Sequence, residues 1–250
     1  MSSKFKDFLV DVSAVDLKTK NIQKWALIVV DMQNDFIGGS MAHLNPQVVI
    51  ECQRTIPIIN RLLKYVKFDL VVYSRDWHPP GHISFVSSEK SNRSEKWPEH
   101  CVRKTWGAEY HKDLYINPKE MKTIHVLKGT KQNEECYSAM QGEFKLKKNR
   151  TKLADYFQTH SFDSIFVCGM LSEYCVLSTC KEIFELNITK NLYVLVDAVL
   201  GLKPFDPKMF YKFSLLTTTD RLIQSVMKFQ IKMPLKELKF LQERLRNESD

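Results

Sequence analysis

The sequence lacks the features that mark disulfide scaffolds, membrane proteins and repeat proteins. Its six cysteines form no CxxC pair and show none of the dense spacing of a secreted disulfide framework. Residues 1–20 carry scattered acidic side chains and no continuous apolar core, so we expect neither a secretory signal nor a membrane span there. No internal repeat or low-complexity segment is present. We therefore expect an intracellular protein with reduced thiols. It should be cytoplasmic, with entry into the nucleus also possible, and not secreted.

Positive charge exceeds negative charge, with 37 Lys and Arg against 29 Asp and Glu and a formal net charge of +8 at pH 7. The basic residues are dispersed, apart from one local cluster formed by Lys145, Lys147, Lys148, Arg150 and Lys152. No basic-aromatic motif of a nucleic-acid-reading module accompanies this cluster. We interpret it as a solvated basic face with some non-specific attraction for anions. Neither a specific nucleic acid nor a membrane is an expected partner.

Short apolar runs alternate with helical spacing along most of the 250 residues. The runs predict strands at 25–30, 70–73, 123–127, 164–168 and 192–196. Helical spacing predicts helices at 45–66, 152–159, 172–186, 208–227 and 234–247. Thr151 is the predicted cap of the second helix and Ser172 of the third. The range 208–227 leaves room for a short sixth strand.

Strands that alternate with helices indicate a parallel sheet covered on both faces. The predicted fold is α/β: a single-domain, doubly wound, mostly parallel sheet flanked by helices. We expect this domain at 24–230, with an N-terminal extension over 1–23 and a C-terminal helical extension over 231–250.

Reactive side chains stand at the ends of the predicted strands. Asp31, Asp76 and Lys128 follow or end three strands, and Cys175 falls in the first turn after a fourth, where free amides stabilise a thiolate. The carboxyl ends of parallel strands share one edge, so these residues can converge there. A carboxylate such as Asp31 can accept the thiol proton, and Lys128 can stabilise the thiolate and developing charge. The backbone amides of Leu171 and Cys175 could bind an oxyanion.

A second group of residues suggests a metal site. Asp76 and His78 are separated by one residue, so both point the same way if the strand continues. His100 could return from the long segment 77–122 as a third ligand, and His82 lies between them. Two imidazoles and one carboxylate leave open positions, as in catalytic metal sites. Ordinary surface histidines in a loop-rich segment are the alternative.

Five separate blocks, in order, resemble nicotinamidases of the isochorismatase-like cysteine hydrolases, over roughly residues 25–200. The blocks are ALIVVDMQNDF (26–36), SRDWHPPGHISF (74–85), WPEHCVRKTWGAE (97–109), LKGTKQNEECYSAM (127–140) and VCGMLSEYCV (167–176). The resemblance implies a catalytic triad of Asp31, Lys128 and Cys175, and a cis peptide bond between Met170 and Leu171. Cys136 departs from the acidic or small residue of many relatives, which leaves the pocket contacts near it open.

The same resemblance implies a metal bound by Asp76, His78 and His100. The ion is usually zinc (Zn²⁺), with iron or manganese (Fe²⁺ or Mn²⁺) in some members. His82 matches a position that is a ligand in some relatives and not in others. Phe36, Trp97 and Tyr174 match positions that contact the pyridine ring.

The implied activity is hydrolysis of nicotinamide to nicotinate and ammonia through a thioester, as part of pyridine-nucleotide salvage. Pyrazinamide is the expected substrate analogue. Assembly into a homo-oligomer is left open. A related amidase or ureido hydrolase acting on another small amide is the first alternative. An isochorismatase proper fits less well because of the metal-binding residues. A non-catalytic binding protein on this fold would not need the nucleophile.

Overall fold

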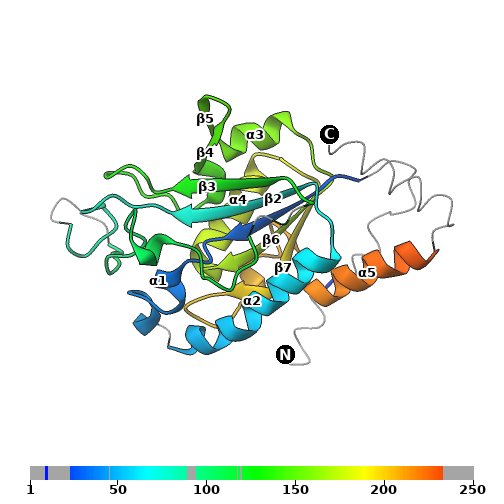
Figure 1. Cartoon of the computed structure of the whole chain (residues 1–250), viewed down its shortest axis with the longest axis horizontal. Helices are drawn as coiled ribbons and strands as arrows, with labels where there is room; N and C mark the ends of the chain where they lie inside the picture. The colour runs from blue at the N-terminus through cyan, green and yellow to red at the C-terminus, as the bar shows by residue number, and fades with distance from the viewer. Residues whose placement is uncertain are drawn as a thin grey trace.

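The computed structural model describes residues 9–10, 23–44, 46–88, 94–116, 118 and 120–232, and an eight-stranded sheet forms its centre (Figure 1). The strand order is β5-β4-β3-β2-β1-β6-β7-β8. The strands are β1 (Trp25–Val30), β2 (Leu70–Asp76), β3 (Thr123–Lys128), β4 (Glu143–Leu146), β5 (Asn149–Lys152), β6 (Ser164–Met170), β7 (Asn191–Leu200) and β8 (Leu215–Thr217). All neighbours pair in parallel except β3 with β4 and β4 with β5, which are antiparallel. The predicted fold class is confirmed.

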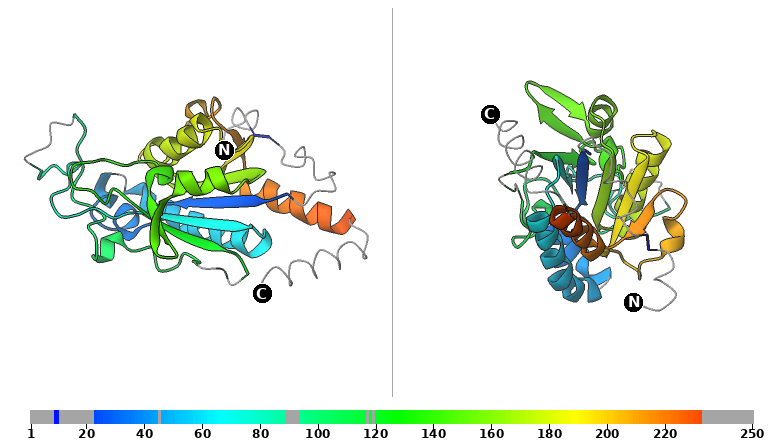
Figure 2. Two further views of the ribbon diagram at one scale, coloured as in Figure 1. Left: turned by 90° about the horizontal axis from the view of Figure 1, so that it is seen from above. Right: turned by 90° about the vertical axis from the view of Figure 1, so that its right-hand side faces the viewer.

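The central strands β1 and β6 are mostly apolar because both of their faces are covered. Every residue of β1 and β6 is buried. On one face pack α1 (Asn34–Ile37), α2 (Gln47–Tyr65) and α5 (Thr219–Lys232), and on the other α3 (Leu153–Thr159) and α4 (Leu177–Glu185) (Figures 1 and 2). The two helical layers give the sheet two separate hydrophobic cores, one on each side.

The order of the strands reverses at β1, which places a crevice at its carboxyl end. The chain passes from β1 outward to β2 and β3, and later returns to pair β6 with the other side of β1. Ligands of open α/β sheets bind at such a reversal point. Gly169 lets β6 approach β1 closely, since a Cβ on it would lie 2.1 Å from the Val30 carbonyl oxygen.

Two predicted elements at the C-terminal side of the sheet needed correction. The helix predicted over 208–227 begins only at Thr219, as α5, and the short sixth strand for which that prediction left room is β8. The strand predicted at 192–196 continues to Leu200, because Asp197 is accommodated by hydrogen bonds from the Thr219 amide and hydroxyl groups.

Two predicted helix caps were also wrong. Thr151 belongs to β5, and α3 begins after Lys152 with no side-chain cap. The sequence did not predict the β4–β5 hairpin that contains Thr151. Its polar and basic residues lie at an exposed edge of the sheet and show no alternation of apolar and polar side chains. Ser172 is not a cap: Leu171 occupies the cap position of a π-helical turn over Ser172–Val176 that precedes α4.

The chain termini lie largely beyond what the structure describes. Of the N-terminal extension, Leu9 bridges to Leu216 of β8 in parallel, and the Val10 amide donates to the Leu216 carbonyl at 2.8 Å. The helix predicted over 234–247 is outside the described residues. Among the described helices, none is both long and apolar enough to cross a bilayer.

Candidate active site

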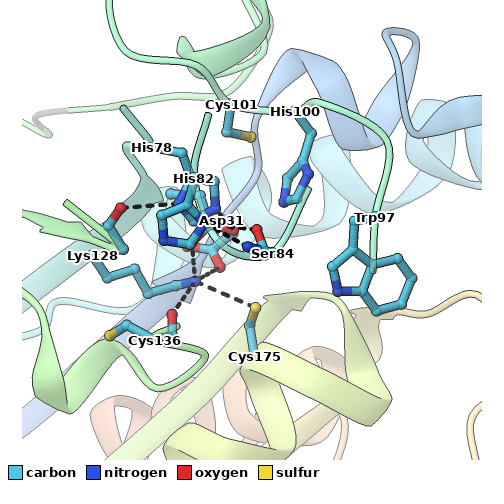
Figure 3. Close-up of polar contacts among 12 residues, drawn as sticks. Asp31, His78, His82, Ser84, Trp97, His100, Cys101, Lys128, Cys136 and Cys175 are labelled. Atoms are coloured by element: carbon cyan, nitrogen blue, oxygen red, sulfur yellow. Dashed lines mark hydrogen bonds and ion pairs between the residues drawn. The ribbon is translucent and has the colours of Figure 1, made fainter. Parts of the chain in front are cut away.

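The ammonium group of Lys128 is the centre of a buried polar cluster at the carboxyl edge of the sheet (Figure 3). Its Nζ lies 2.9 Å from Asp31 Oδ2, and it also forms an ion pair and hydrogen bond with Asp76 Oδ1. It donates to Cys175 Sγ at 3.4 Å and to the Cys136 carbonyl oxygen at 3.3 Å. One cation from β3 therefore joins side chains that follow β1, end β2 and follow β6.

The thiol and both carboxylates lie close together. Ligand atoms of Asp31, Asp76 and Cys175 all lie within 4.8 Å of one another, and the three residues are buried. The convergence of Asp31, Lys128 and Cys175, which the strand ends predicted, is present in the structure. The thiol thus has carboxylates that could accept its proton in the same buried cluster, with the ammonium group beside both.

Two buried residues that sequence reasoning missed hold the carboxylates in place. Ser74 Oγ donates to Asp31 Oδ1 at 2.7 Å. The Gln33 side chain bridges β1 to β2, accepting from the Asp76 amide and donating to the Asp76 carbonyl oxygen, both at 2.8 Å. Single uncharged residues of this kind follow no pattern, and only their closeness to Asp31 and Asp76 could have indicated a role.

Burial and neighbouring charges shift the ionisation of the cluster. Burial alone would lower the pKa of Lys128, but Asp31 and Asp76 raise it well above its ordinary value. Burial raises the pKa of the Asp31 carboxyl, against the opposing effect of Lys128. Burial likewise raises the pKa of the Cys175 thiol well above its ordinary range, although Lys128 again opposes it. The resting site therefore holds a charged ammonium beside a neutral thiol.

Asp76 belongs to both halves of the site. Burial would raise the pKa of its carboxyl, but Lys128 and His78 lower it. Asp76 Oδ2 lies 3.7 Å from His78 Nε2. Ligand atoms of Asp76, His78 and His100 all lie within 4.8 Å of one another. The predicted carboxylate and two imidazoles are thus brought together next to Lys128.

The hydrogen bonds of the imidazoles fit a metal ion. His78 Nδ1 donates to the Gly129 carbonyl at 2.9 Å, and His100 Nδ1 donates to the Pro98 carbonyl at 2.8 Å, so in the neutral form of each ring Nε2 carries the lone pair that binds a metal. Burial and the nearby His78 lower the pKa of His100 to about 4, so its ring is neutral at pH 7, as a ligand must be. Burial would lower the pKa of His78, but Asp76 raises it, so this ring must give up a proton when it binds a metal ion. One carboxylate and two imidazole nitrogens suit Zn²⁺ or a similar divalent ion.

His82 lies beside this set. Its ring stacks on His78 at 4.1 Å, its Nδ1 is 2.7 Å from Ser84 Oγ, and its Nε2 donates to the Glu134 carbonyl at 3.0 Å. With both nitrogens engaged, His82 supports the His78 ring in this arrangement. Ligand atoms of His78, His82 and Glu135 also lie within 4.8 Å of one another, and Glu135 is a residue that sequence reasoning missed.

Aromatic side chains surround the two centres. Phe36 packs on His100 with ring centroids 5.5 Å apart, and Trp97 meets Tyr174 edge to face at 5.0 Å. Trp97 Nε1 donates to the Tyr137 hydroxyl at 3.2 Å, and that ring lies 5.7 Å from Tyr174. The three residues predicted to contact a ring thus lie around the site, and Tyr137 joins them.

A π-helical turn presents Cys175. The amides of Tyr174 and Val176 both donate to the Leu171 carbonyl at 3.1 Å, and Thr179 Oγ1 donates to the Cys175 carbonyl at 2.7 Å. The peptide bond between Met170 and Leu171 is cis, as the resemblance implied. Leu171 and Cys175, the predicted oxyanion-binding residues, therefore lie at the two ends of one short turn.

A doubly wound sheet with a buried Asp–Lys–Cys cluster and an adjacent Asp–His–His set defines a class of hydrolases. Residues 25–217 match the isochorismatase domain, and the chain belongs to this family. Within the family it belongs to the nicotinamidase group. It is 32% identical over 197 residues to a nicotinamidase of Acinetobacter baylyi, covering 74% of this chain and 85% of the relative.

Solved structures agree with this assignment. A nicotinamidase and pyrazinamidase from Acinetobacter baumanii superposes with a TM-score of 0.65 at 27% identity, over 81% of this chain and all of the other. A pyrazinamidase of Pyrococcus horikoshii in complex with zinc gives a TM-score of 0.58 at 31% identity, over 78% of this chain and 99% of the other.

Proposed function

We propose that the protein is a nicotinamidase that hydrolyses nicotinamide to nicotinate and ammonia through a thioester on Cys175. The observation that carries the proposal is the contact of Lys128 with both Asp31 and the Cys175 sulfur, in a buried cluster next to two histidines. Ammonia release from nicotinamide, pyrazinamide and a carbamoyl substrate, measured side by side, tests it. Faster turnover of the carbamoyl substrate would instead favour a ureido hydrolase.

In the first half of the reaction, Asp31 takes the Cys175 proton and the sulfur attacks the carboxamide carbon. Lys128 stabilises the charge that develops, and the Leu171 and Cys175 amides are the proposed oxyanion donors. Asp31 then returns its proton to the departing nitrogen, which leaves as ammonia, and a thioester remains. The raised pKa of Asp31 suits a group that must both accept and donate this proton near neutral pH.

In the second half, a water molecule attacks the thioester carbon and gives a proton to Asp31. Lys128 again faces the developing oxyanion. Collapse of the tetrahedral intermediate breaks the carbon–sulfur bond, nicotinate is released, and the Asp31 proton returns to the sulfur. Phe36, Trp97 and Tyr174 are the proposed contacts of the pyridine ring, where flat aromatic surfaces stabilise a flat ligand.

The proposed metal ligands are Asp76, His78 and His100, with zinc as the favoured ion and iron or manganese as alternatives. A bound divalent ion would supply a Lewis-acid position for a ring nitrogen or a water molecule. His82 and Glu135 lie beside these ligands, where they can orient His78. Asp76 holds Lys128 as well, so the same carboxylate would link the ion to the catalytic cluster.

Removal of the metal is expected to abolish ammonia release, and added Zn²⁺ is expected to restore it. His100→Ala removes one of the three proposed metal ligands. Loss of a residue that only hydrogen-bonds to a ligand typically lowers metal affinity roughly 10- to 100-fold, so the zinc affinity of this variant should fall by more than that. Metal-to-protein ratio and ammonia release are measured together. His43→Ala, which changes an exposed histidine, is the matched control. Full activity in protein shown to be metal-free would contradict the assignment.

Loss of the Ser74 hydroxyl is expected to shift the pH profile. Ser74 donates to the Asp31 carboxylate and lowers its pKa, so Ser74→Ala should raise the pKa of Asp31 further. Asp31 works as a base only when ionised, so the acid limb of kcat/KM should move to higher pH. Ser164→Ala is the control, because Ser164 is also buried but lies at the amino end of β6, away from the carboxyl edge that holds the site. An unmoved limb in Ser74→Ala would argue against Asp31 as the base.

A further inference from the structure

A basic cavity lies at the edge of the sheet formed by β2, β3 and the β4–β5 hairpin. Its volume is about 470 Å³, within the roughly 300–1,000 Å³ typical of small-molecule sites. The lining residues that matter here are Arg75, His125, Glu143, Lys145, Lys148 and Arg150. Three of them belong to the basic cluster that the sequence alone presented as a solvated face.

The strand register explains why these residues share a surface. Arg75 of β2 is paired with Leu127 of β3, and Leu127 with Glu143 of β4. Alternate residues of a strand point to opposite faces. Arg75 and Leu127 therefore point away from Asp76 and Lys128, their immediate neighbours in sequence. The cavity is on the other face of the sheet from the catalytic cluster.

Arg75 is held rigidly at this cavity. Its Nη1 pairs with Glu109 Oε2 at 2.6 Å, and its guanidinium carbon lies 4.8 Å and 4.7 Å from the ring centroids of Trp77 and Tyr110. Its Nε is buried and has no hydrogen-bond partner within the described part of the chain. Arg75 therefore brings a fixed, planar positive charge to the cavity wall, although its Nε is enclosed by protein and is not open to a ligand.

The other basic side chains leave positive charge in excess. Arg150 Nη1 is 3.5 Å from Glu143 Oε2, and Glu143 is the one acidic side chain of the lining. Lys145 and Lys148 form no ion pair with any described residue. With the Glu109 partner of Arg75 included, four cations stand against two carboxylates, and a ligand with two negative charges would balance the excess.

We propose that this cavity binds a phosphate-bearing small molecule, with Arg75, Lys145 and Lys148 around the phosphate. A phosphate group carries more charge than a carboxylate, and Arg suits its bidentate geometry while Lys adds point charges. The site is independent of the proposed hydrolysis, since it contains none of the residues of the catalytic cluster. The phosphodiester backbone of a nucleic acid could also bind these basic residues, and the test below distinguishes it from a small molecule.

Calorimetric titration of the full-length protein with pyrophosphate and with adenosine monophosphate, at fixed ionic strength, tests the proposal. Lys145→Ser/Lys148→Ser removes two exposed lysines of the cavity, and at least about tenfold weaker binding of both probes is expected. Lys190→Ser/Lys212→Ser makes the same charge change at exposed positions outside the cavity and should bind as tightly as the parent. Circular dichroism checks that all variants are folded.

Arg75→Lys keeps the charge and removes the planar guanidinium, so it should also bind the probes at least about tenfold more weakly. Equal losses in the two lysine double variants would indicate diffuse attraction and overturn the proposal. Parent-like affinity in Arg75→Lys would do the same. Tight binding of a single-stranded oligonucleotide without binding of pyrophosphate or adenosine monophosphate would also overturn it, in favour of a nucleic-acid surface.

Discussion

Cys175→Ala is expected to lower the rate of ammonia release from nicotinamide by about 10⁴- to 10⁶-fold, as removal of a nucleophile does in other enzymes with covalent intermediates. The Cys175 sulfur is the proposed nucleophile, which forms the bond to the carboxamide carbon. Asp31 and Lys128 would remain in place but would have no nucleophile to activate. The measurement is single-turnover ammonia release at enzyme excess, which detects slow residual activity.

Two other cysteines provide matched controls for this variant. Cys168 in β6 and Cys180 in α4 are also buried, and burial raises the pKa of each thiol. Neither is part of the Lys128 cluster, so their alanine variants should keep near-normal turnover while losing some stability through the cavity left behind. Substantial turnover by Cys175→Ala, with its folding verified by circular dichroism, would eliminate the thioester mechanism.

The sequence predicted the convergence of the site because the rule behind it is topological. Asp31, Asp76 and Lys128 stand at strand ends, and parallel strands bring such ends to one edge whatever lies between them. The sequence could not predict Gln33 and Ser74, because their roles depend on which buried partner each one faces. Local residue types thus located the reactive groups, while only tertiary structure identified the groups that orient them.

The errors in the fold also have a physical cause. The strand at Leu215–Thr217 has three residues, which is too short to show a period of its own, and the turns beside it continued an apparent helical pattern. The β4–β5 hairpin is polar and exposed, so its pairing is set by its neighbours in the sheet more than by its own side chains. The hairpin was therefore not predicted, and the sixth strand was expected but not located, whereas the buried strands were found.

Loss of the Lys128 ammonium is expected to damage the fold as well as the activity. Lys128→Met would leave the Asp31 and Asp76 carboxylates buried within 4.8 Å of each other without a cation between them. Removing one partner from a buried ion pair typically costs about 3–5 kcal/mol. We therefore expect a loss of about that size in the free energy of unfolding, measured by urea denaturation with chelator present, together with loss of turnover.

The pH dependence of this variant separates charge from packing. In the parent, Lys128 and His78 lower the pKa of Asp76, so its contribution to stability is present at neutral pH and lost as pH falls. In Lys128→Met at least one carboxyl pKa should rise, so stability should be lost as pH rises through that value. The deficit of the variant should therefore be larger at pH 7.5 than at pH 5.

Two further variants complete the argument. Lys67→Met changes an exposed lysine between α2 and β2 and should cost little stability at either pH. Lys128→Met/Asp76→Asn removes one buried negative charge along with the cation, so it should recover part of the lost stability and remain inactive. A Lys128→Met protein as stable as the parent at both pH values would mean that the buried carboxylates do not depend on this cation. The electrostatic basis of the proposed mechanism would then be wrong.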